Sequence, residues 1–300
     1  MKNIIKVSFI YTLIFITILS PNIFSNENKW KVEIELDKQT YVLYEPIWLD
    51  VNLYNRTSET LRTQGLSDPN QSQFIIEFKD SIGGTVEYTG PQYLMVADSG
   101  KLFLEPGEND YGSFDLLDFF GSFEEKSGYS VLVTRFHFIP KGAYTIRVLF
   151  EDNFSNELTF NIEEPFGEEK QALELIEEAS KIWTSNNTDT SAQIFQEIVD
   201  KFPNSVFVEK CYYLSRFYLQ KNRDKRKQGL FDYRTFYIEF LENYPNSGNS
   251  KSWLLSITRD LDDDQKLKIF NKYIEDYPNT RCSKFAKQMK ERILKKKDGE

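Results

Sequence analysis

The sequence predicts a multidomain protein in which an all-β sandwich is followed by an all-α helical solenoid. From residue 30 to residue 164 the apolar residues alternate with polar ones, which is the period of half-buried strands. After a hinge at 163–167 the apolar residues recur at helical spacing. A short phrase containing Pro-Asn then occurs three times in the second half. A length of 300 residues is typical of about two domains.

Residues 1–25 have the features of a secretory signal peptide. Lys2 and Lys6 precede an apolar run at 7–19, and a small residue, Ser25, stands before the polar segment that follows. A retained membrane anchor is the alternative, but the run of 13 residues is shorter than the roughly 20 that span a bilayer. We expect cleavage after Ser25 and no integral membrane segment afterwards.

The mature chain is expected to be exported and acidic. No cysteine lies near the cleavage site, so we do not expect a lipoprotein, and the destination is the periplasm, the cell surface or the extracellular space. Loss of two lysines with residues 1–25 takes the net charge from −9 to −11. Nucleic acid and anionic membranes repel such a chain, so no nucleic-acid partner is expected. The oligomeric state stays open.

The β-sandwich is predicted over residues 28–164. In the first strand Val32, Ile34 and Leu36 alternate with charged residues, and turn-forming Pro and Gly residues separate the later segments. Short strands at this density without intervening helices are typical of a sandwich. The expected strands lie at 30–36, 47–53, 73–78, 85–88, 92–96, 129–138, 143–150 and 157–162.

Four segments of this half form a recognisable set: Tyr41-x-x-Tyr44-Glu45-Pro46-Ile47-x-Leu49-x-Val51-x-Leu53-x-Asn55, Leu104-Glu105-Pro106-Gly107-Glu108, Gly142-Ala143-Tyr144-Thr145-Ile146-Arg147-Val148 and Ser155-Asn156-Glu157-Leu158-Thr159-Phe160. Together they resemble the Ig-like sandwich modules of bacterial secreted proteins. The resemblance implies an early strand and a closing hairpin, and almost nothing about a ligand. Because this half contains no cysteine, the disulfide of antibody-type domains is absent.

The repeated phrase predicts the turns of the solenoid. Proline ends a helix, and the Asn and Ser or Thr after it can cap the next one. The prolines are 42 and 33 residues apart, which is the range of two-helix repeats. The structural turn residues are Pro203, Asn204, Pro245, Asn246, Pro278 and Asn279.

The α-helical repeat domain is predicted over residues 168–296, with a tail at 297–300. Each helix carries an apolar stripe that it cannot bury alone, so the helices must stack. They are expected at about 168–184, 190–202, 205–220, 230–243, 249–259, 263–276 and 280–296.

The most informative stretch of this half is Phe195-Gln196-Glu197-Ile198-Val199-Asp200-Lys201-Phe202-Pro203-Asn204-Ser205-x-x-x-x-Lys210-Cys211-Tyr212-Tyr213-Leu214. It resembles the tetratricopeptide-like repeats of periplasmic and outer-membrane assembly proteins. The resemblance implies protein or peptide binding in a concave groove. The middle unit is nine residues longer than the last, and the final helix ends in a basic tail.

Three tyrosines are candidates for the partner-binding surface: Tyr212, Tyr213 and Tyr237. Core packing explains most aromatic residues of this half, but surplus tyrosines suit a binding face. The basic clusters at 221–227 and 295–297 are interpreted as a solvated loop and a helix C-terminus, with contact to an acidic partner as the alternative.

No catalytic or metal-binding constellation is predicted, and we expect a non-enzyme without cofactors. His137 is the single histidine, so a histidine-based metal site or catalytic triad cannot be assembled. The acidic run at 260–264 could form a Ca²⁺ loop, but a helix cap by Asp262 with Gln265 fits better. Cys211 and Cys282 are expected as buried free thiols, with a disulfide as the alternative.

The leading hypothesis is an exported, non-catalytic adaptor or scaffold that binds proteins or peptides through its helical repeats. The alternative is a glycan-binding or protease-inhibitory β-sandwich for which the helices are a spacer. A hydrolase using carboxylates would require an acid-lined cleft between the domains.

Overall fold

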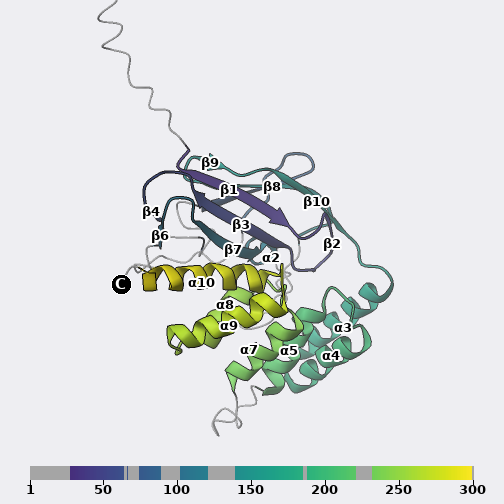
Figure 1. Cartoon of the computed structure of the whole chain (residues 1–300). Helices are drawn as coiled ribbons and strands as arrows, with labels where there is room; N and C mark the ends of the chain where they lie inside the picture. The colour runs from purple at the N-terminus through teal and green to yellow at the C-terminus, as the bar shows by residue number, and fades with distance from the viewer. Residues whose placement is uncertain are drawn as a thin grey trace, which may run out of the picture.

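A computed structural model describes residues 28–63, 66, 74–88, 102–120, 139–184, 188–220 and 232–298. The expected signal peptide, the strands expected at 92–96 and 129–138 with His137, and the basic cluster at 221–227 lie outside these residues. None of the helices in the described ranges has the length and apolar character needed to cross a bilayer. A strand-rich region is followed by a helical region, as expected (Figure 1).

The β region contains two principal sheets. The first is antiparallel and has the order β1 (Trp30–Leu36), β3 (Trp48–Asn55) and β7 (Asn109–Asp115). The second has the order β2 (Thr40–Val42), β10 (Leu158–Glu163), β8 (Gly142–Phe150) and β5 (Phe74–Asp80), and β9 (Asn153–Phe154) pairs with β8. A small third sheet pairs β4 (Leu61–Thr63) with β6 (Leu102–Leu104).

The two principal sheets share one hydrophobic core. Alternation places Val32 and Ile34 of β1 on the inner face, against Ile146 and Val148 of β8. A fully buried side chain of this size contributes about 1.5–3 kcal/mol to folding. The short helix α2 (Leu116–Phe120) adds three more buried residues to the same core.

Strand β7 was not expected from the sequence, because only one of its three inner-face residues, Phe114, is apolar. Asp110 is buried there and accepts hydrogen bonds from the backbone N–H of Leu66, at 2.7 Å, and from Gln288, at 3.2 Å. Gly112 faces inward where a Cβ would lie 3.0 Å from Leu66. By contrast, the strand expected at 85–88 amounts to one isolated bridge, between Thr85 and Lys79.

The described helices of the second half lie within a few residues of the expected ranges. They are α3 (Gly167–Thr184), α4 (Thr188–Lys201), α5 (Val208–Gln220), α7 (Tyr233–Asn243), α8 (Ser250–Thr258), α9 (Asp263–Asp276) and α10 (Arg281–Asp298). Helices α4 and α5, α7 and α8, and α9 and α10 pack against each other across the three repeated turns. The apolar stripes are buried in two clusters.

The three turns share one hydrogen-bonding pattern. In each, the Ser or Thr donates its N–H to the carbonyl of the residue before proline, and its hydroxyl accepts an N–H two or three residues further on, at or just before the start of the next helix. The backbone bonds join Ser205 to Phe202 (2.9 Å), Ser247 to Tyr244 (3.0 Å) and Thr280 to Tyr277 (3.4 Å). The hydroxyls accept from Phe207, Asn249 and Ser283. The phrase therefore ends one helix and holds the backbone that leads into the next.

The second turn also holds the start of α10. Its Asn246 side chain accepts the N–H of Arg281 at 3.2 Å, and the carbonyl of Pro245 accepts the N–H of Cys282 at 3.0 Å. The third turn contains Asn279 at φ 67°, a left-handed conformation that Asn tolerates better than most residues. The second and third turns are thus joined directly to each other.

One buried guanidinium connects the helical region to the β region. Arg281 donates from Nε to Asp50 of β3 at 2.8 Å and from Nη1 to the carbonyl of Asn246 at 2.9 Å. Arg281 and Asp50 are each only 4 % exposed. Asp37, in the turn after β1, lies 4.0 Å from the same guanidinium. Three segments that are distant in sequence therefore meet at this group.

At the same junction, the backbone of Gly248 packs closely against the aromatic ring of Trp48. Gly248, just after the second turn, lies against the indole of Trp48 at the start of β3, and a Cβ at position 248 would be 1.9 Å from that ring. Tyr111 of β7 belongs to the hydrophobic cluster of the helices, and Val42 and Tyr44 pack on the other cluster. The two regions are packed together rather than merely tethered.

We predict that Gly248→Ala destabilises the chain through its contact with Trp48. Overpacking of this kind typically lowers the free energy of unfolding by about 1–3 kcal/mol. The measurement is the free energy of unfolding in urea for the wild type, each single variant and the pair Gly248→Ala with Trp48→Ala. In the Trp48→Ala background the added methyl should cost little, because the ring it meets is gone. An equal cost in both backgrounds contradicts the contact.

We also predict that Glu209 makes stability depend on pH. Burial at the start of α5 raises its pKa to about 7, against the opposing effects of the Ser247 hydroxyl and Arg281. The folded chain then holds a proton that an unfolded chain, with a glutamate pKa of about 4.3, has released. Stability therefore falls as pH rises from about 4 to about 7.

Replacing Glu209 with glutamine removes this titration. The Glu209→Gln variant should gain unfolding free energy relative to the wild type as pH rises from 4.5 to 8, measured by urea unfolding at each pH. Glu178→Gln, at an exposed position of α3, is the matched control. Parallel pH profiles for the wild type and Glu209→Gln would show that Glu209 is ionised normally.

Candidate functional site

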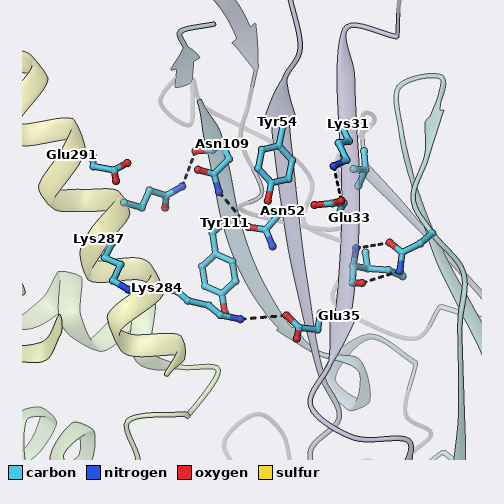
Figure 2. A pocket seen from close by; sticks show the side chains of 14 residues that line it. Lys31, Glu33, Glu35, Asn52, Tyr54, Asn109, Tyr111, Lys284, Lys287 and Glu291 are labelled. Atoms are coloured by element: carbon cyan, nitrogen blue, oxygen red, sulfur yellow. Dashed lines mark hydrogen bonds and ion pairs between the residues drawn. The ribbon is translucent and has the colours of Figure 1, made fainter. Parts of the chain in front are cut away.

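A groove lies between the outer face of the first sheet and helix α10 (Figure 2). Its volume is about 830 Å³, within the range of about 300–1,000 Å³ that is usual for ligand pockets. The sheet forms the floor, α10 forms one wall, and Asn156 lies on the opposite side. We call this cavity the α10 groove.

The floor is built by strand alternation and register. The inner face of β1 is apolar, so the alternate residues on its outer face are the polar ones. Antiparallel pairing aligns these residues with outer-face residues of β3 and β7 in cross-strand rows. The rows are Lys31, Tyr54 and Asn109; Glu33, Asn52 and Tyr111; and Glu35, Asp50 and Ser113.

Polar side chains of the floor hold one another in place. Lys31 and Glu33 form an ion pair at 2.6 Å, and the Asn109 amide donates to the Asn52 carbonyl oxygen at 3.3 Å. Burial, and then the neighbouring charge of Glu33, raises the pKa of Tyr54. The tyrosine is therefore a neutral hydroxyl at physiological pH.

The α10 wall is tied to the sheet along its length. Lys284 pairs with Glu35 at 3.3 Å, and Gln288 donates to the Asn109 carbonyl at 3.0 Å. Arg292 pairs with Asp110 at 3.1 Å, one turn further on. These contacts fix the helix beside the strand. Among the described residues, the buried side-chain oxygen of Gln288 has no hydrogen-bond partner.

A smaller cavity of about 180 Å³ continues the groove along α10. It shares Asn109, Gln288 and Glu291 with the larger cavity. Its far end is closed by the Gly107 turn and by the ion pair between Lys295 and Glu108. The combined space is therefore elongated and follows the helix axis.

The free edge of β1 is covered where it borders the groove. The Asn156 side chain accepts the N–H of Ile34 at 2.9 Å and donates to its carbonyl at 3.0 Å. An amide thus replaces the hydrogen bonds that an added strand would make. A ligand at this position would therefore contact the side chains of the floor and not the backbone of β1.

The groove is close to electrically neutral. Its lining contains three lysines, at 31, 284 and 287, and three glutamates, at 33, 35 and 291. Across the described ranges no cluster of three or more His, Cys, Asp or Glu side chains is placed to hold a metal ion. The arrangement offers many hydrogen-bond donors and acceptors without a strong field of either sign.

The three tyrosines predicted to bind a partner pack between the helices. Tyr212 is buried, with its ring 5.8 Å from that of Phe240. Tyr213 and Tyr237 are half-buried and each stack on Trp253, at 5.7 Å and 6.0 Å. The structure brings the three into one aromatic cluster, away from the α10 groove lining. Their part in partner binding stays a prediction.

Other sequence expectations concern residues with structural roles. Asp262 accepts the N–H of Gln265 in a capping box, so the acidic run at 260–264 starts helix α9, which confirms the cap. Cys211 and Cys282 are buried free thiols. Lys295, Lys296 and Lys297 each form an ion pair, with Glu108, Asp263 and Asp264, which is consistent with the expected helix C-terminus.

Sequence reasoning missed the residues of the α10 groove. Lys31, Glu33 and Glu35 were visible only as the polar side of an alternating strand, which usually faces water. Asn109 and Tyr111 lie on the strand that was not expected. The signal that could have indicated a site is the density of Asn and Tyr on these outer positions, but their alignment depends on the strand register.

Comparisons with known proteins support the helical repeats. The tetratricopeptide repeat family model matches residues 170–205. No curated protein sequence matches the chain.

Solved structures resemble the chain only weakly. A β-glucosidase from Erythrobacter marinus is 12 % identical, over 45 % of this chain and 15 % of that one, with a TM-score of 0.27. The alkylpurine DNA glycosylase AlkC of Pseudomonas fluorescens, bound to DNA containing an abasic site analog, is 11 % identical over 45 % and 30 %, with a TM-score of 0.23. The sporulation control protein Spo0M of Bacillus subtilis is 12 % identical over 50 % and 55 %, with a TM-score of 0.24.

These structural likenesses are too low to carry an argument about fold or activity, and the chain spans about half or less of the length of these relatives. The family match and the helices agree with each other. The second half of the chain therefore contains tetratricopeptide-like repeats, which suggests an interaction scaffold.

Proposed function

We propose that this chain is an exported, non-catalytic adaptor that binds protein or peptide partners through its helical repeats. The observation that carries the proposal is the tetratricopeptide match at residues 170–205, within a region whose turn phrase recurs three times. Repeats of this kind stack into extended surfaces that suit protein binding.

Export and the class of the first domain belong to the same proposal. The charged, apolar and small-residue segments at 1–25 support a signal peptide. An Ig-like assignment of the β region is supported by two principal sheets that share one core. In this arrangement the β region contacts a second partner while the repeats hold the first.

The docking of α10 leaves other helices for partners. Helix α10 lies against the β region, whereas α3 and α4 lie at the far end of the helical region (Figure 1). The half-buried rings of Tyr213 and Tyr237 flank Trp253 between α5, α7 and α8. Both side chains keep some exposure, which suits contact with a partner.

The test uses the full chain, because the helices are packed on the β region. Alanine at Tyr213 or Tyr237 would remove the stacking on Trp253, so we choose phenylalanine, which keeps the rings. Tyr213→Phe with Tyr237→Phe should weaken binding of a crosslinked, purified envelope partner by about tenfold through lost hydroxyl contacts. Affinity is measured by titration of that partner.

The matched control is Tyr88→Phe, which removes a hydroxyl from a half-buried tyrosine of the β region that does not line the α10 groove. It should leave partner affinity unchanged. If the double variant binds every captured partner as tightly as the wild type does, while its thermal unfolding is also unchanged, the aromatic cluster is not the binding surface. If no partner crosslinks to the helical region at all, the adaptor function is wrong.

A further inference from the structure

The floor of the α10 groove differs from an ordinary solvent-facing sheet because a helix is fixed beside it. Asn52, Tyr54 and Tyr111 project toward the space between the sheet and α10 (Figure 2). The hydrogen bonds of Asn156 to Ile34 and of Gln288 to Asn109 hold the two sides of the groove at a set separation. The site is thus formed before any ligand arrives, which lowers the entropy lost on binding.

Several polar groups of the groove have unused hydrogen-bonding capacity. Asn52 accepts from Asn109, and within the described part of the chain its amide nitrogen donates to nothing. In the same residues, Lys287 and Glu291 form no ion pair on the groove side of α10. A ligand that both donates and accepts hydrogen bonds would satisfy these groups together.

Charge and shape limit the chemistry of that ligand. Three lysines balance three glutamates, so neither a phosphate nor a cation is favoured. The apolar lining residues Val32 and Ile34 point their side chains into the core, where they are 4 % and 5 % exposed. Neither of these two side chains is therefore available to the apolar anchor that peptide binding usually needs.

We propose that the α10 groove binds a neutral oligosaccharide. Each sugar hydroxyl is a donor and an acceptor, which matches a floor where amides, phenols and charged groups alternate. The Tyr54 ring, half-buried on the middle strand, supplies an aromatic surface for the apolar side of a sugar ring. The second cavity extends the space along α10, so a chain of several sugars fits better than one.

This site is independent of the repeat surface proposed above, and the two can fail separately. Partner binding involves Tyr213 and Tyr237, whereas the sugar would contact Asn52 and Tyr54. Loss of sugar binding with partner binding retained, or the reverse, identifies which proposal is wrong.

The experiment is isothermal titration of the full mature chain with a panel of oligosaccharides. The neutral probes are cellotetraose, xylotetraose, maltotetraose, laminaritetraose and chitotetraose, and the anionic probe is tetragalacturonate. At least one neutral probe should bind saturably and more tightly than tetragalacturonate. Asn52→Ala and Tyr54→Ala should each weaken that binding by about tenfold, through a lost hydrogen bond and a lost ring surface.

The matched control is Asn161→Ala, which removes an exposed amide from β10 in the second sheet and should leave affinity unchanged. Circular dichroism melting checks that each variant is folded. The proposal is overturned if none of the neutral probes binds, if both groove variants bind as the wild type does, or if tetragalacturonate binds best. Displacement of the sugar by an extended neutral peptide of higher affinity would assign the groove to peptides instead.

Discussion

The structure depends on the buried ion pair between Arg281 and Asp50. Asp50 stands in the middle of the outer face of β3, and Arg281 is the first residue of α10 after the third turn. A charge buried to this degree must keep its partner, because an unpaired one is strongly unfavourable. The pair therefore fixes the position of the last repeat on the sheet. Arg281 also donates to the carbonyl of Asn246, so the preceding repeat is held in place by the same side chain.

The position of α10 then determines the groove. Lys284, Gln288 and Glu291 follow Arg281 at helical spacing, so the helix face that carries the buried arginine also provides the wall. The more exposed pairs at Lys284 and Lys295 add little stability individually, but they repeat along the helix and hold its direction. One interaction thus accounts for both the interdomain arrangement and the candidate ligand site.

The sequence was informative where local chemistry decides the structure. Proline, asparagine and serine or threonine locate the turns and helix ends to within a few residues, and alternation locates β1, β3, β8 and β10. It was uninformative where distant residues decide. Strand β7 buries Asp110 because α10 supplies Gln288 and Arg292, and Arg281 meets Asp50 across 231 residues of chain. Such pairings have no local signature, so the groove between them could not be predicted.

The most direct measurement is differential scanning calorimetry of residues 26–300, for the wild type and for Arg281→Ala. If the pair holds the two regions together, the wild type unfolds in one transition whose calorimetric and van't Hoff enthalpies agree. Arg281→Ala should lower the free energy of unfolding by about 3–5 kcal/mol and therefore lower the transition temperature. The single unfolding transition should also separate into two. Two transitions in the wild type, or one unshifted transition in Arg281→Ala, would contradict the central role of this ion pair.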